Sequence, residues 1–164
     1  MQKIYMLIGV LFSAVVLFSF SAIQNESPEV DYPTGYRGWT HIKSKVAISN
    51  TGGKITGIYH HIYANALAIE GYKTGKFANG SVIVADFIAA VDSSAALFEG
   101  QRKYIDVMVK NTEQYASTGG WGFEEFDKDS KTARKVTLVN AQKACFTCHQ
   151  GQAANNFVFS KYRE

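Results

Sequence analysis

The only two cysteines of this 164-residue chain lie three positions apart and are followed at once by a histidine, in the run Cys145-Phe146-Thr147-Cys148-His149. This pattern is the attachment signature of a c-type haem. On a helix, positions i, i+3 and i+4 share one face, so one turn can present two thiols to the haem vinyl groups and an imidazole to the iron. The motif therefore predicts one covalent haem c, with thioethers at Cys145 and Cys148 and His149 as the axial iron ligand.

Other uses of a cysteine pair fit the sequence less well. A thioredoxin-like redox pair follows a strand in a βαβ pattern, which the sequence before this motif lacks. A zinc site needs a second ligand pair, and His41, His60 and His61 do not have the spacing of a zinc finger. A disulfide between residues so close together would close a very short loop, with little entropic benefit. We therefore favour haem attachment.

The start of the chain has the layout of an export signal. Lys3 precedes an uncharged apolar run over residues 4–22, which ends in small residues. This layout predicts a cleaved signal peptide over residues 1–22, with an uncleaved membrane anchor as the alternative. Because covalent haem attachment takes place outside the cytoplasm, the leader and the haem motif both predict a periplasmic protein.

Charge and length restrict the function further. Removal of the leader takes away one lysine. The mature chain then has 16 Lys and Arg and 14 Asp and Glu, which gives it a net charge of +2. The basic residues are scattered along the sequence and form no run, which excludes nucleic-acid binding driven by a strongly basic surface. Residues 23–34 are polar and contain two prolines, which predicts a linker, and residues 35–164 are long enough for one haem domain.

The rest of the sequence predicts an α+β fold, mostly an antiparallel sheet with a few short helices. Asn65 and Gly75 flank an expected helix over 66–73, and Asn140 is expected to cap a C-terminal helix that carries the haem motif. The stretch 94–103 could begin helically. Candidate strands, rich in β-branched and aromatic residues and separated by turns, span 38–48, 54–63, 81–91, 102–111 and 121–126.

These features together resemble the cytochrome P-460 and cytochrome c′-beta family, which are small exported monohaem proteins with a predominantly β fold. Helical electron-transfer cytochromes and four-helix cytochromes have too few strands to match. The resemblance covers residues 32–163. It rests on residues 60–84, with a Lys-Thr-Gly-x-Phe-x-x-Gly-x-Val core, on the strand around Met108, on GGWGFEEF at 119–126, and on ACFTCHQG and FVFSKYR near the end.

The resemblance implies a proximal histidine at His149, a sheet as the opposite wall of the haem pocket, and a homodimer. Members of the family with a lysine bonded to a haem meso carbon are associated with hydroxylamine oxidation. The c′-beta members lack that bond and bind nitric oxide and related diatomics. The position that corresponds to this cross-linking lysine is at or close to Ala85. No lysine lies between Lys76 and Lys103, so this chain lacks the lysine that would bond to the haem.

The expected strand over 81–91 also predicts the distal pocket. Ile83, Ala85 and Phe87 share one face of it because side chains alternate along a strand. If Ala85 faces the haem, these three form a mostly apolar pocket that offers no hydrogen-bond donor and disfavours anions. Phe87 could equally be an ordinary core residue. In the cross-linked members of the family a polar distal arginine assists the chemistry, and the resemblance implies that its approximate position here is Tyr59, which could donate one hydrogen bond.

A sixth iron ligand would change the function. Met108 is the only methionine after the leader, and a His/Met pair would indicate an electron carrier, although core packing is the simpler role for it. His60 and His61 point to opposite faces of a strand, so only one can approach the haem. Solvated positions are expected for three acidic residues that could otherwise donate protons, namely Asp106, Glu124 and Glu125.

The leading prediction is thus a periplasmic, five-coordinate c-type haem protein that binds nitric oxide or a similar small ligand. A periplasmic electron-transfer cytochrome with an unidentified partner is one alternative. A haem redox enzyme acting on hydroxylamine or peroxide is another, and a thiol oxidoreductase without haem is a remote one.

Overall fold

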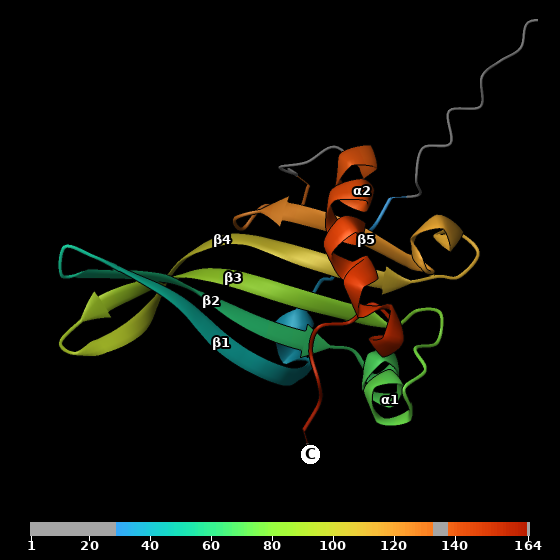
Figure 1. The fold of residues 1–164 in the computed structure, drawn as a ribbon, viewed down its shortest axis with the longest axis horizontal. Coiled ribbons are helices and arrows are strands. Elements are labelled where there is room, and N and C mark those ends of the chain that lie inside the picture. The colour runs from blue at the N-terminus through green and yellow to red at the C-terminus, as the bar shows by residue number, and fades with distance from the viewer. Residues whose placement is uncertain (1–28, 133–137, 164) are drawn as a thin grey trace, which may run out of the picture.

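The computed structural model describes residues 29–132 and 138–163, and over these it consists of one curved antiparallel sheet with helices on one face (Figure 1). The predicted signal peptide, residues 1–22, lies outside the described residues, as does the first half of the predicted linker. Among the residues described, none of the helices is long and apolar enough to cross a membrane.

The sheet contains five strands in the described part of the chain, and each pairs with the next in the order β1-β2-β3-β4-β5. The predicted α+β class, mostly antiparallel sheet with a helix near the C-terminus, is confirmed. The strands are β1 (Thr40–Thr51), β2 (Lys54–Ala64), β3 (Val82–Ser93), β4 (Ala96–Lys110) and β5 (Trp121–Asp127), and the helices are α1 (Ala66–Thr74) and α2 (Leu138–His149). Short 3₁₀ turns lie at Tyr36–Gly38, Ala116–Thr118 and Gln150–Asn155.

One sequence expectation was wrong at the tip of the β3–β4 hairpin. The stretch 94–103 does not begin helically; Ser93 pairs with Ala96, and β4 runs from there. The two turn residues, Ser94 and Ala95, both have positive φ, 52° and 61°. A two-residue hairpin turn requires this backbone, so pairing with β3 overrides the helical preference of the alanine-rich stretch.

The sequence predicted where α1 starts and ends, but it misplaced the start of α2. Asn65 caps α1 as expected, since its side-chain oxygen accepts a hydrogen bond from the Ala68 N–H at 2.9 Å, and Gly75 ends it at φ 72°. Helix α2 begins at Leu138, so Asn140 lies inside the helix and is not its cap. The haem motif still occupies the last two turns of α2, as predicted.

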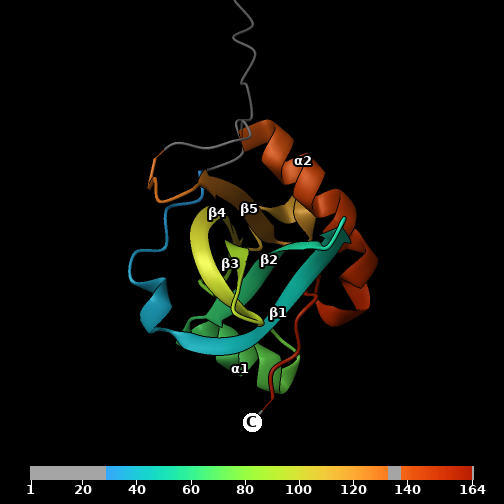
Figure 2. The same ribbon diagram turned by 90° about the vertical axis from the view of Figure 1, so that its left-hand side faces the viewer.

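The sheet has a different hydrophobic core on each face, because successive residues of a strand point to opposite sides. On one face, Val84 packs with the segment before β1, which includes Val30 and Tyr36. On the other face, Ile83 packs with Phe123, α1 and α2. Figure 2 shows the sheet curving around this second face, with α2 along its β5 edge and β1 at the other edge. The curvature leaves room for a cavity there.

Candidate functional site

Helix α2 is attached to the edge strand β5 by a buried glutamine. The Gln142 side-chain oxygen accepts from the backbone N–H of Phe123 at 3.3 Å, and its amide donates to the Phe123 carbonyl at 3.0 Å. An edge strand has backbone groups without a neighbouring strand, and the Gln142 amide satisfies one such pair. This contact fixes the helix that carries Cys145, Cys148 and His149 against the sheet.

His149 ends α2 with its ring held in a defined orientation. Its Nδ1 lies 2.7 Å from the Phe157 carbonyl oxygen, which can only accept, so Nδ1 carries the proton and Nε2 keeps its lone pair. Burial lowers the pKa of His149, and the Phe157 carbonyl opposes this shift. The rings of Phe123 and Phe159 lie 4.9 Å and 4.8 Å from the imidazole. The ring is thus neutral, oriented and ready to bind a metal through Nε2.

The carbonyl that orients His149 belongs to an unusual turn. Asn156 and Phe157 both have positive φ, 52° and 64°, which is an outlier for a bulky residue such as phenylalanine. The Trp121 indole N–H donates to the Asn156 carbonyl at 2.9 Å, and the Asn156 amide donates to the Gly75 carbonyl at 2.7 Å. Contacts from β5 and the end of α1 therefore stabilise a strained turn beside the ring of His149.

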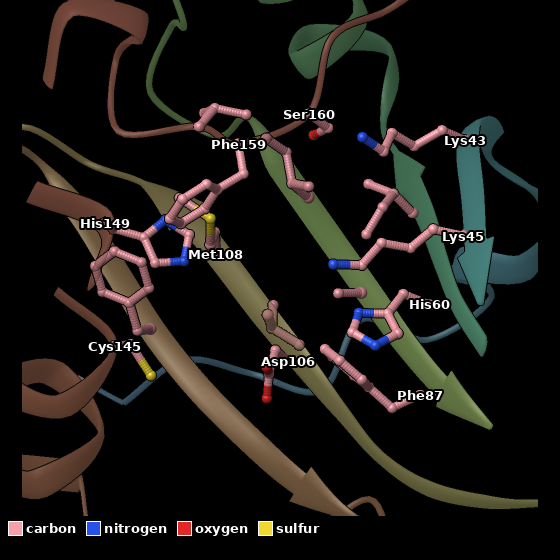
Figure 3. Close-up of a pocket in the computed structure, with 16 residues that line it drawn as sticks. Lys43, Lys45, His60, Phe87, Asp106, Met108, Cys145, His149, Phe159 and Ser160 are labelled. Atoms are coloured by element: carbon pink, nitrogen blue, oxygen red, sulfur yellow. The ribbon is translucent and has the colours of Figure 1, made fainter. Parts of the chain in front are cut away.

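A cavity of about 870 Å³, counting its open mouth, lies between α2 and the far edge of the sheet (Figure 3). This size is typical of a cofactor site. Cys145 and His149 line it on the α2 side, and residues 158–160 cover one end. The floor comes from β3, β4 and β5 and consists mainly of Ile83, Ala85, Phe87, Asp106, Met108 and Phe123. The far wall comes from β1 and β2 and consists of Lys43, Lys45, His60 and Ile62.

The structure places three of the four predicted distal residues in this cavity. Ile83, Ala85 and Phe87 all lie on its floor, as the alternation along β3 requires. Tyr59 is not among the described lining residues: its hydroxyl donates to the Leu97 carbonyl at 2.7 Å, and its ring stacks on His61 on the other face of the sheet. Its neighbour His60 does line the cavity, because successive residues of a strand point to opposite faces of the sheet.

Met108 and the acidic residues also differ in part from expectation. Met108 is buried at 7% exposure and pairs across the strands with Phe123, whose ring contacts His149. Its sulfur therefore lies on the His149 side of the cavity (Figure 3). Asp106 lines the cavity floor and Glu124 is 1% exposed, so neither has the solvated position expected of it.

Sequence reasoning missed the far wall. Apolar side chains form most of the lining, but Lys43, Lys45 and His60 supply donors that the predicted pocket lacked. The signal was present in the sequence, because lysines two apart in a strand share a face. The pairing of β1 with β2 decides which face of the sheet these lysines occupy and which residue lies beside each of them. In this pairing Lys45 lies opposite His60. Burial, and next the charge of Lys45, lower the pKa of His60, which favours the neutral ring.

The residues present fit a covalently attached haem. Cys145 and His149 face one cavity from the same helix, and both cysteines are free thiols. Burial, reinforced by the nearby carboxylates, raises the pKa of Cys145 to about 12, so its thiol is neutral. Cys148 is exposed and is not among the described lining residues, although it directly precedes His149. Aromatic rings from the floor and the C-terminal segment flank the space beside the imidazole, as a flat apolar group requires.

Comparison with known proteins supports this interpretation. The model of a family described as cytochrome P460 matches residues 33–160, which is most of the chain. The match includes all five strands of the described sheet, the haem motif and the turn that holds the ring of His149. No curated protein matches the chain.

Proposed function

This chain belongs to the cytochrome P460 family of haem-binding cytochromes, and from that premise we propose that Cys145 and Cys148 hold one haem c, with His149 as its proximal ligand. The observation that carries the proposal is the orientation of His149. Its Nδ1–H donates to the Phe157 carbonyl, which leaves Nε2 free toward the cavity that Cys145 also lines. Such a hydrogen bond to the non-ligating nitrogen is typical of metal-binding histidines.

The opposite side of the cavity supports an open iron site. When bound, the haem supplies an iron centre that takes diatomic ligands. Ala85 leaves space on the floor between Ile83 and Phe87, and β3 has no lysine there to bond to the porphyrin. Ile83, Ala85 and Phe87 exclude water from the floor of the site, which suits a diatomic ligand such as nitric oxide on the reduced iron.

Met108 does not favour the electron-carrier alternative. Met108 lies on the cavity floor between Ile83 and Phe123 and is 7% exposed, so core packing holds its side chain. Its packing there agrees with a role as core residue.

The test is spectroscopic, on protein matured by a cytochrome c assembly system. We expect a reduced, five-coordinate, high-spin haem that binds nitric oxide. Cys145→Ala and Cys148→Ala should each leave a single thioether in a pyridine haemochrome spectrum, and His149→Ala should abolish the high-spin histidine-ligated species. A six-coordinate low-spin spectrum without added ligand, or failure to bind nitric oxide, contradicts the proposal.

Export and assembly are further parts of the proposal. The leader over residues 1–22 supports a periplasmic location, where an electron-transfer partner of unidentified nature would keep the iron reduced. Apolar side chains exposed on the two long hairpins, Val46, Ile48, Val91 and Phe98, support a homodimer. Light scattering on the purified protein tests the dimer, and a monomer at micromolar concentration contradicts it.

A further inference from the structure

Two polar residues of the far wall form a pair across the cavity from His149. Lys45 on β1 lies directly opposite His60 on β2, and both line the cavity (Figure 3). Residues opposite each other on one face of an antiparallel pair have neighbouring side chains. The two side chains are therefore neighbours on the wall of the cavity across from His149.

The ring of His60 is held in place by a row of aromatic side chains. Its centroid lies 4.4 Å from that of Phe87, which in turn stacks on Tyr104 at 4.4 Å and 23°. Because burial and the charge of Lys45 lower the pKa of His60, the ring is neutral and can donate one hydrogen bond. Lys45 is exposed at the cavity mouth and brings a full positive charge on a flexible stem.

The second lysine of the wall has a different position. In Figure 3 the Lys43 amine points toward Ser160, at the end of the cavity away from Cys145. Lys43 would hold a carboxylate of the bound haem at that end, which leaves Lys45 and His60 for a ligand. Among the described lining residues, Asp106 is the carboxylate that opposes these three basic groups.

We propose that Lys45 and His60 make this face of the site a binding place for small anions, of the class of azide and nitrite, on the oxidised protein. The inference rests on the proposed haem site and adds a ligand class to it. The Lys45 ammonium group stabilises the negative charge of the anion, and the His60 ring donates a hydrogen bond to it. An apolar pocket would instead disfavour an anion because of its desolvation cost.

The experiment is an optical titration of the oxidised holoprotein with azide, at neutral pH and fixed ionic strength. Lys45→Met removes the charge and keeps most of the length of the side chain. It should weaken azide binding about tenfold, as expected for loss of one nearby charge at a partly solvated site. His60→Phe should weaken it further. The matched control, Lys76→Met on the exposed surface after α1, should change the affinity less than threefold.

Carbon monoxide binding to the reduced protein separates this inference from the proposed function. If carbon monoxide binds normally but Lys45→Met leaves azide affinity unchanged, or weakens it no more than Lys76→Met does, the anion site is wrong and the open haem site stands. If the oxidised protein is low-spin and Lys45→Met makes it high-spin, Lys45 is itself an iron ligand and the inference is overturned. If the reduced protein binds no carbon monoxide, the proposed function fails.

Discussion

A methyl group added at Gly119 should disturb the proximal side of the site from outside it. Gly119 precedes β5 and has φ 66°. A Cβ there would lie 2.3 Å from the nearest atom of the Phe157 ring, far inside van der Waals contact. The carbonyl of the same Phe157 orients His149. Gly119→Ala must therefore displace either its own backbone or the residue that orients His149.

The expected cost can be divided with a matched control. Gly52, in the β1–β2 turn, has φ 61°, and no described atom lies within 4 Å of a Cβ added there. Gly52→Ala thus measures the penalty for alanine in a left-handed conformation, about 1 kcal/mol. Gly119→Ala adds the cost of overpacking against an aromatic ring, about 1–3 kcal/mol. We expect a loss of about 3 kcal/mol of unfolding free energy at Gly119.

Urea unfolding of both variants measures the difference, and redox titration of the holoprotein measures its effect on the site. A displaced Phe157 carbonyl weakens the hydrogen bond to Nδ1, which makes His149 a poorer electron donor and should raise the reduction potential of the haem. Gly52→Ala should leave the potential unchanged. If Gly119→Ala costs no more than Gly52→Ala, or leaves the potential at its original value, the ring of Phe157 is free to move and the reasoning is wrong.

Three further predictions concern buried or paired groups. Asp86 is fully buried and accepts hydrogen bonds from a tyrosine and two arginines, so Asp86→Asn should lower the unfolding free energy by about 3 kcal/mol, measured by urea unfolding. In protein made without haem, Cys145 should react with iodoacetamide at pH 8 at least 100-fold more slowly than Cys148, as followed by mass spectrometry. The reason is that the pKa of Cys145 is raised to about 12, whereas Cys148 is exposed. Equal rates would refute the burial of Cys145. The pKa of His60 is lowered in the folded state, so the stabilisation that its neutral ring provides is lost as the pH falls below 6.5. Lys45→Met should raise the pKa of His60 toward 6.5 in an NMR titration. An unchanged pKa would show that Lys45 and His60 are not neighbours.

The sequence predicted the sheet well where local patterns determine the strands. Paired glycines at 52–53 and 119–120 separate runs of β-branched and aromatic residues, and both pairs have the positive φ that such turns require. It failed at Ser94 and Ala95, where non-glycine residues adopt the same backbone. Local propensity favours a helix in the alanine-rich stretch there. Only the pairing of β3 with β4 makes it a hairpin, and that pairing is not local.

The α2 side of the site could be predicted from a local motif, whereas the β1–β2 wall could not, because it depends on strand pairing. Cys145, Cys148 and His149 lie within five residues on one helix, so their spacing alone predicts the proximal side. The far wall joins Lys45 to His60 through the register of β1 on β2, and a shift of β1 by one residue would turn Lys45 away from the cavity. Haem attachment therefore depends on a short motif, whereas the choice of ligand depends on sheet register. Substitutions on β1 can change which ligands bind while the attachment motif and the orientation of His149 stay intact.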